Sequence, residues 1–282
     1  YLEEIGELEN TIIIVTSDNG MAFPRAKANA YEYGIHVPFA VRYPKEFPEG
    51  KIVNNPIGFA DLAPTILELT NSTSDGMLPI SGESFAGILK SENEDSEPEI
   101  DAYAFAGRER HSSSRYLNWG YPQRTVRSED FLMVWNMKPE RWPAGAPQRI
   151  VKGTTDELWP MYGIDEDGKH HSEWAFTDID AAPTKSFIIE NRNDEDVSRY
   201  FDLAHAKRPE WEMFNVKNDP YCLNNLAGDE TYADLEKQLR DVLLQELTET
   251  EDPRVVGADK EVFDSYKRYS PMREFPKPES PK

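Results

Sequence analysis

The sequence has one cysteine, Cys222, and too few basic residues to balance its acidic ones. A single cysteine excludes an intrachain disulfide, and its neighbours suggest no metal or redox partner, so we predict that Cys222 is a buried small hydrophobe. The 282 residues carry 31 Lys and Arg against 52 Asp and Glu, a formal net charge of −21. That charge argues against non-specific binding to nucleic acid or to an anionic membrane surface. An anionic ligand would therefore need a local cationic site.

Long apolar runs are also missing from the sequence. No stretch approaches the roughly 20 apolar residues that cross a bilayer, so we expect no membrane span. The first residues lack the basic start and apolar middle of a signal peptide. At 38% hydrophobic residues, the chain has enough apolar side chains for a sizeable core in one large or two moderate domains.

The N-terminal third has the pattern of an α/β fold. Leucines and an isoleucine at helical spacing predict a helix over residues 2–9. Residues 11–17 are apolar on both faces, which favours a buried central strand, and residues 36–42 predict a second strand. A further helix is predicted over residues 59–69, with Asp61 as its N-cap and a proline in its first turn.

The rest of the chain predicts a smaller α+β unit. Residues 91–101 are acidic and almost without apolar side chains, which indicates a solvated connector and a boundary near residue 97. A helix over residues 232–248, with its leucines on one stripe, is predicted to close the unit. The Pro-rich tail from about residue 265 is expected to pack weakly. Aromatic or alternating segments predict the strands of an antiparallel sheet at residues 101–107, 124–136, 185–192 and 210–216.

The apolar strand over residues 11–17 leads directly into Asp18, Asn19 and Gly20. In α/β sheets, ligands gather at the carboxyl ends of strands. A carboxylate beside an amide oxygen suits a hard cation such as Ca²⁺, and glycine allows a sharp turn. The alternative is a turn without any ligand, because the same three residues favour tight bends.

Several motifs together resemble the sulfatase family, within the alkaline phosphatase superfamily. The first are Ser-Asp-Asn-Gly at residues 17–20, Lys27, and Gly-Ile-His-Val-Pro at residues 34–38. The resemblance covers residues 1 to about 230, and its later part is most similar to the branch that contains heparan N-sulfatase, or sulfamidase. Sulfatases have Asp-Asn at this strand end, whereas two-zinc phosphodiesterases generally have Asp-His, so Asn19 favours one Ca²⁺. The later segments are FADLAPTILELT, GESFAGIL, GRERHSSSR, KPERWPAG, PTKSFIIENR and RPEWEMFNVKNDPYCLNNLA.

The resemblance implies a division of the chain and a missing part. Residues 1–97 would be the C-terminal part of the large catalytic α/β domain, residues 98–250 an α+β subdomain that contributes to the substrate cleft, and residues 251–282 an extended tail. The family's nucleophile is a formylglycine made in a Cys/Ser-x-Pro-x-Arg motif, which this sequence lacks. We therefore expect the chain to be the C-terminal part of a sulfatase, inactive by itself and partnered by the N-terminal half. The family also implies a periplasmic or secreted location.

The resemblance also assigns roles to basic side chains. Lys27 lies eight residues after Asn19, where the family places a cation on the sulfate, and it is the predicted catalytic residue. Otherwise it would be an ordinary surface lysine. A second basic cluster, expected at the mouth of the cleft, would bind the sugar through paired hydrogen bonds. Instead of binding sugar, the arginines would form ion pairs with surplus carboxylates, and the histidine would have a structural role. The cluster consists of Arg108, Arg110, His111 and Arg115.

Three functions remain open at this point. The first is hydrolysis of a sulfate ester or sulfamate on a sulfated oligo- or polysaccharide, such as a glycosaminoglycan. The second is a phosphodiesterase or phosphonate hydrolase with the same fold, which Asn19 in place of histidine disfavours. The third is a carbohydrate-binding relative that has lost its nucleophile.

Overall fold

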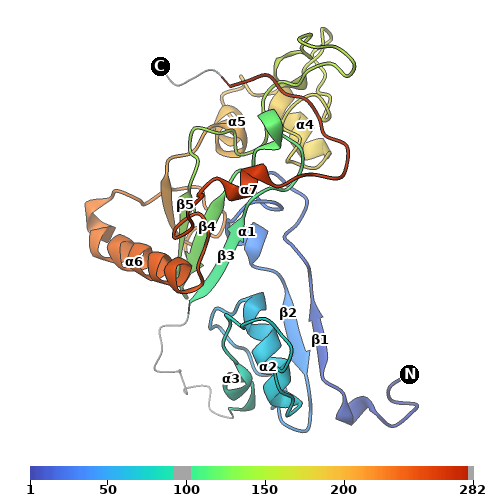
Figure 1. The fold of residues 1–282 in the computed structure, drawn as a ribbon, viewed down its shortest axis with the longest axis vertical. Helices are drawn as coiled ribbons and strands as arrows, with labels where there is room; N and C mark the ends of the chain where they lie inside the picture. The colour runs from blue at the N-terminus through green and yellow to red at the C-terminus, as the bar shows by residue number, and fades with distance from the viewer. Residues whose placement is uncertain (92–102, 279–282) are drawn as a thin grey trace.

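The computed structural model describes residues 1–91 and 103–278, and Figure 1 shows its fold. The N-terminal part begins with a 3₁₀ turn, Leu8–Asn10, and an antiparallel pair of strands, β1 (Ile13–Thr16) and β2 (Phe39–Arg42). Helix α1 (Glu32–Ile35) precedes β2. A second 3₁₀ turn, Phe59–Asp61, then leads into α2 (Leu62–Leu69), and α3 (Ala86–Lys90) follows.

Two predictions for this part need correction. Residues 2–9 do not form a continuous helix, because Gly6 has a φ of 74°, in the left-handed region. The first strand lies where it was predicted, but in the described residues it pairs only with β2, and Val15 is 64% exposed. Figure 1 shows this two-stranded ribbon extending away from the larger sheet, with α2 and α3 beside it.

The predicted helix over residues 59–69 is present as a 3₁₀ turn followed by α2. Asp61 is at the N-cap position of α2 but makes no capping bond to that helix. Its carboxylate instead accepts from the backbone N–H of Gly58 at 2.7 Å and of Glu83 at 3.0 Å. Asp61 therefore ties the start of the helix to the segment before α3.

The C-terminal part is built on an antiparallel sheet of four strands in the order β3-β4-β5-β6. The strand predictions for 101–107 and 210–216 are confirmed in place, although residues 101 and 102 lie outside the described ranges. The predicted segment 124–136 is extended but forms two antiparallel strands, β4 and β5, joined by a turn. Residues 185–192 instead lie largely in helix α4, where Pro183 opens the helix and Lys185 and Ile189 are buried on one face. The strands are β3 (Ala104–Arg108), β4 (Gln123–Arg127), β5 (Phe131–Asn136) and β6 (Trp211–Asn215), and the helices α4 (Pro183–Glu190), α5 (Ser198–His205), α6 (Ala233–Glu249) and α7 (Val262–Ser265), with 3₁₀ turns at Tyr116–Asn118, Met161–Gly163 and Glu230–Tyr232.

Apolar side chains cover both faces of this sheet. Helix α6 packs its leucine stripe on one face, and Figure 1 shows this helix beside the sheet. The predicted closing helix is thus confirmed within one residue at each end. On the other face, Tyr31 and Ile35 of the N-terminal part contact Leu132, Phe214 and Cys222. Cys222 is buried, as predicted. The predicted domain boundary near residue 97 lies outside the described residues, and segments on either side of it share this core.

The C-terminal tail is better packed than its composition predicts. Phe275 is 4% exposed. The backbone N–H of Arg273 donates to Ser113 Oγ at 3.0 Å, and that of Ile150 donates to the carbonyl of Glu274 at 3.0 Å. The prediction of a weakly packed tail is therefore wrong for residues 273–275, whereas Tyr269 and Met272 are exposed at 89% and 58%, as a weakly packed segment would be.

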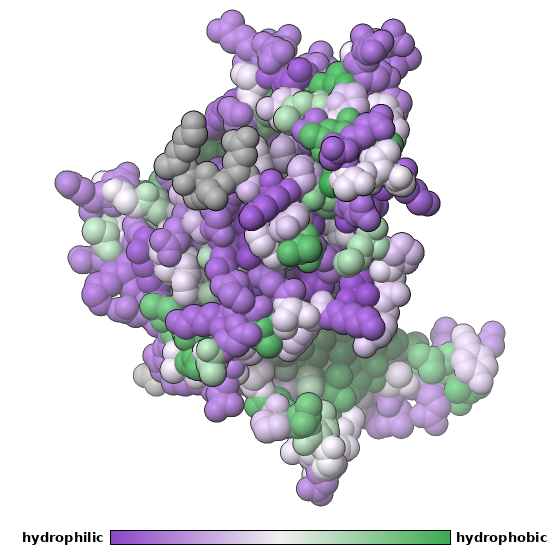
Figure 2. Space-filling view, turned by 45° about the horizontal axis from the view of Figure 1, so that its top comes forward, coloured by the Kyte–Doolittle hydropathy of each residue, from purple (hydrophilic) through white to green (hydrophobic). Residues whose placement is uncertain are grey.

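Two surface properties bear on function. None of the helices in the described ranges has the length and apolarity to cross a bilayer. Figure 2 shows a largely hydrophilic upper part of the molecule and apolar side chains gathered on the lower part of the same face. In the N-terminal part, the exposed large apolar side chains include Val15, Met21, Phe23, Ile52 and Ile66.

Candidate functional site

The Asp-Asn-Gly turn follows β1 and is held against α1. A Cβ atom at Gly20 would lie 1.9 Å from the carbonyl oxygen of Tyr33, so no larger residue fits there. The Gly20 N–H donates to the carbonyl of Gly34 at 3.2 Å. The glycine is thus required by the close approach of two backbone segments, which fixes the direction in which the two preceding side chains leave the strand.

Asp18 and Asn19 have oxygens free to bind a ligand. In the described part of the chain, no hydrogen bond or ion pair engages the exposed Asp18 carboxylate. The half-buried Asn19 amide donates through Nδ2 to the carbonyl of Gly20 at 2.8 Å, which leaves its Oδ1 available. A hard cation such as Ca²⁺ takes six to eight oxygens, and no cluster of three or more His, Cys, Asp or Glu suited to a metal occurs among the described residues. The pair fits such an ion as part of a larger shell, to which other groups must contribute.

Lys27 lies on the compact loop between this turn and α1. Its backbone N–H donates to the carbonyl of Met21 at 2.9 Å, which closes the loop. Its Nζ donates to Oδ2 of Asp180 at 2.9 Å, and both side chains remain partly exposed. The Nε2 atom of His111 lies 3.9 Å from the other oxygen, Oδ1, of the same carboxylate. The structure therefore brings together Lys27 and His111, 84 positions apart in the sequence, on one acidic side chain.

Asp180 was not predicted as a site residue. It belongs to the short segment Thr-Asp-Ile-Asp, 177–180, whose only sequence signal is a pair of carboxylates two residues apart. The hydrogen bond from Lys27 and the nearby charges lower the pKa of the Asp180 carboxyl. The carboxylate therefore stays negative at neutral pH and holds the lysine ammonium in one place.

Arg108 and Arg115 meet on the other carboxylate of that segment. Asp178 Oδ2 lies 2.7 Å from Nη2 of Arg108 and 2.6 Å from Nη2 of Arg115, and all three side chains are at least 93% buried. Both guanidinium groups also donate to the carbonyl of Pro143. This geometry corresponds to the ion-pair alternative, and their predicted role in substrate binding stays a prediction.

Burial and charge act in opposite directions on this pair. Burial by itself would raise the pKa of Asp178, but Arg115 and Arg108 outweigh it and hold that pKa well below its usual range. Burial lowers the pKa of Arg108 to about 10, although Asp178 opposes the change. Asp178 and Arg108 therefore stay charged at neutral pH, and the ion pairs form an electrostatic link between β3, the loop after it and residues 177–180.

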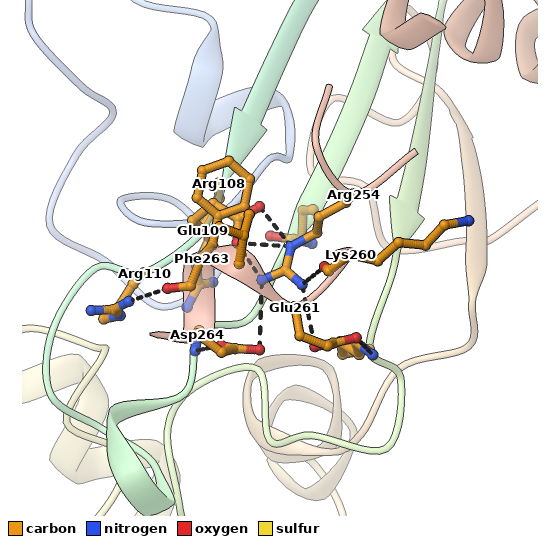
Figure 3. A network of polar contacts seen from close by, with 12 residues as sticks. Arg108, Glu109, Arg110, Arg254, Lys260, Glu261, Phe263 and Asp264 are labelled. Atoms are coloured by element: carbon orange, nitrogen blue, oxygen red, sulfur yellow. Dashed lines mark hydrogen bonds and ion pairs between the residues drawn. The ribbon is translucent and has the colours of Figure 1, made fainter. Parts of the chain in front are cut away.

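Arg110 is held by the C-terminal segment. Its Nη2 donates to the carbonyl of Phe263 in α7 at 2.7 Å. Beside it, Arg254 makes paired hydrogen bonds to both oxygens of Glu109, and Asp264 accepts from the N–H of Gly120. Figure 3 shows Glu109 and Arg110, which follow β3, beside Arg254 and Phe263 of the C-terminal segment. The C-terminal segment thus holds the loop that carries Arg110 and His111.

Comparison with known proteins supports the sulfatase resemblance. The family model described as Sulfatase matches residues 1–72. Human N-sulphoglucosamine sulphohydrolase is 27% identical over 270 residues, covering 92% of this chain and 45% of that protein. An ulvan-active sulfatase of Formosa agariphila is 26% identical over 250 residues, covering 88% of this chain and 34% of that protein.

Solved structures show the same fold. One, described as a complex with its substrate D-glucosamine-2-N,6-O-disulfate, matches with a TM-score of 0.54 and 22% identity over 92% of this chain and 38% of the other. Another, from work on glycosaminoglycan metabolism by Bacteroides thetaiotaomicron, matches with a TM-score of 0.54 and 18% identity over 94% and 42%. The chain spans less than half the length of each of these relatives. The chain is therefore similar to the sulfatase family in the motif at β1 and in the family match over residues 1–72, and it shares its fold with these solved structures.

Proposed function

We propose that this chain is part of a calcium- and formylglycine-dependent sulfatase that hydrolyses sulfate esters or sulfamates on a sulfated carbohydrate such as a glycosaminoglycan. The observation that carries the proposal is the position of Lys27. It lies on the loop that begins at Asp18 and Asn19 and reaches the same carboxylate as His111 of the C-terminal part. One basic side chain from each part of the chain therefore lies at this point, where an anionic group would bind.

Each of these side chains has a distinct chemical role in the proposal. Asp18 and Asn19 would hold Ca²⁺ through their free oxygens. When bound, that ion supplies positive charge to the sulfate oxygens as the bond from sulfur to oxygen or nitrogen breaks. The Lys27 ammonium adds a fixed charge beside the same oxygens. Asp180 orients Lys27, and His111 can donate a hydrogen bond to the sugar or to its leaving oxygen.

The arginines fit the proposal less directly than His111. Arg110 is anchored to α7 but only partly buried. Arg108 and Arg115 are buried and pair with Asp178. In this proposal, His111 and Arg110 contact the carbohydrate, and any contact from Arg108 or Arg115 would require their rearrangement away from Asp178.

The proposal requires an N-terminal half that supplies the formylglycine and further ligands to the ion. The apolar side chains exposed near β1, Val15 and Met21 among them, support such a partner surface, because large exposed apolar patches mark interaction sites. We propose a periplasmic or secreted location for the complete enzyme, as in the family.

The test removes the two proposed ligands from the complete protein. Asp18→Ala and Asn19→Ala should each reduce calcium-dependent release of sulfate from a sulfated oligosaccharide by at least about 100-fold. The far-UV circular dichroism should be unchanged, because neither side chain supports packing among the described residues. Asp156→Ala is the matched control, since Asp156 is also exposed and no ligand role is proposed for it. Full calcium-dependent turnover in either ligand variant would refute the metal assignment.

A further inference from the structure

A group of three arginines surrounds the side chain of Tyr121 inside the C-terminal part. The guanidinium carbons of Arg108 and Arg115 each lie 5.5 Å from the centre of the tyrosine ring, and that of Arg208 lies 5.8 Å from it. Tyr121 is fully buried, and Arg208 is 7% exposed. The arginines come from β3, from the loop after it and from the segment before β6, so the fold itself gathers them.

Many donors in this group have no partner. Within residues 1–91 and 103–278, no hydrogen bond is formed by Nε or Nη1 of Arg108, by Nη1 of Arg115, or by Nε or Nη1 of Arg208, and all of these atoms are buried. The Tyr121 hydroxyl is also buried without a partner. Burial raises the pKa of Tyr121 to about 12, so this hydroxyl keeps its proton at neutral pH and is a further donor. Unpaired buried donors are rare in folded proteins and call for an acceptor.

Positive charge exceeds negative charge in the group. Asp178 forms ion pairs with Arg108 and Arg115 together, so one carboxylate serves two guanidinium groups. In the described part of the chain, Arg208 forms no ion pair, and its one hydrogen bond is to Oδ1 of Asn29 at 2.9 Å. Glu212 forms its hydrogen bonds with the Tyr31 hydroxyl and the Asn136 amide, each at 2.7 Å, and acts on Arg208 only through its charge. Three guanidinium groups therefore face two carboxylates, Asp178 and Glu212. A buried charge without a partner is costly, which favours a counter-ion at this place.

Contacts with aromatic rings do not replace that counter-ion. Arg208 lies between Tyr31, at 4.7 Å, and Tyr121, at 5.8 Å, and gains cation–π attraction from both. Such contacts attract the guanidinium charge as a whole, but a ring face is a weaker hydrogen-bond acceptor than an anion. The unpaired N–H groups therefore still need an acceptor.

We propose that this group binds a small inorganic anion, of the chemical class of chloride, between Arg208 and the Arg108–Arg115 pair. The unpaired donors have almost no contact with solvent, so a sugar sulfate cannot reach them and the site is separate from Lys27 and His111. The anion, bound by Arg208, helps to join the N-terminal segment to the sheet, because Arg208 also contacts Asn29 and Tyr31. It acts as a structural ion and does not depend on the proposed function.

The experiment measures thermal unfolding of the complete protein while chloride replaces gluconate at constant ionic strength. An anion that binds only the folded state raises the unfolding midpoint with the logarithm of its concentration, by about 1–2 °C for each tenfold rise above its dissociation constant. Gluconate is too large for the site and serves as the reference anion. In a crystal soaked in bromide, an anomalous peak should appear within hydrogen-bond distance of the Arg208 guanidinium.

Three variants make the result decisive. Arg208→Gln should lose the chloride response. Arg240→Gln should keep it, because Arg240 lies at the surface of α6 over Trp211. Tyr121→Phe keeps the ring and removes one donor, so it should weaken chloride binding even if Arg208→Gln fails to fold. Equal midpoints in chloride and gluconate, or an unchanged response in Tyr121→Phe, would overturn the proposal.

Discussion

At the scale of single residues, two aspartates two positions apart have different tasks. Asp178 points into the protein and pairs with two buried arginines, whereas Asp180 is half-exposed and pairs with Lys27. Removing one partner from a buried ion pair leaves an uncompensated charge, while an exposed pair contributes little because water screens it. Asp178 therefore contributes mainly to the stability of the fold, and Asp180 belongs to the candidate site.

This difference gives a matched pair of variants. Asp178→Asn should lower the free energy of unfolding by about 3–5 kcal/mol, because Arg108 and Arg115 lose their shared counter-ion. Asp180→Asn should lower it by only about 0–1 kcal/mol. Urea denaturation followed by circular dichroism measures both. Equal losses in the two variants would contradict the assigned burial of Asp178.

At the scale of elements, helix α6 shows how apolar residues at helical spacing form a buried face. Its leucines at helical spacing face β4 and β5, and Leu239 and Leu243 are each 1% exposed. Helix α4 shows the opposite case, because its two adjacent isoleucines favour a strand by composition. Pro183 and the burial of Lys185 and Ile189 on one face favour the helix that is observed. Burial of a periodic face thus outweighs the preference of individual residues.

Adjacent leucines of α6 test this packing. Leu243→Ala should destabilise the protein by about 2–5 kcal/mol, because it removes buried methyl groups and leaves a cavity against the sheet. Leu244 is 37% exposed, so Leu244→Ala should cost no more than about 1 kcal/mol. Both substitutions replace leucine with alanine, so they change helix propensity equally. Thermal and urea unfolding measure the loss of stability in each variant. Similar costs for the two would mean that α6 does not pack as described.

At the scale of the whole molecule, the N-terminal part is joined to the sheet by charge as well as by apolar contact. Glu32 of α1 accepts from Nε of Arg127 in β4 at 2.8 Å and interacts with Nδ1 of His36 at 2.8 Å. Burial by itself would raise the pKa of Glu32, but the hydrogen bonds from His36 and Arg127 lower it to about 2 from an ordinary value of 4.5. The link therefore depends on the ionised carboxylate.

That dependence predicts how the protein responds to acid. A carboxyl with a lowered pKa in the folded state stabilises the protein fully above the unfolded pKa, and this contribution is lost as pH falls toward the folded pKa. Glu32 should therefore lose on the order of 2–3 kcal/mol of stabilisation between about pH 4.5 and 2. Glu32→Gln should flatten the pH profile of unfolding free energy in this window, whereas Glu129→Gln, at an exposed turn, should not. Parallel profiles for the wild type and Glu32→Gln would contradict the link.

The sequence by itself determined where several elements lie. An uninterrupted apolar run located β1, start signals located α2, and apolar patterns located α6 and most strands of the sheet, because these signals depend only on local geometry. The Asp-Asn-Gly turn and Lys27 carried the resemblance to sulfatases, which the family match supports. Their roles in binding an ion and a sulfate stay predictions.

Only the tertiary structure decided which charges meet. No local pattern connects Lys27 with Asp180, or Arg108 and Arg115 with Asp178, since the partners are 63 to 153 positions apart. The sequence likewise did not indicate that Arg208 joins the group around Tyr121, or that Glu32 of α1 pairs with Arg127 of β4. Which carboxylate faces which cation is set by the packing of the sheet, and that packing comes from the sum of many contacts between distant segments.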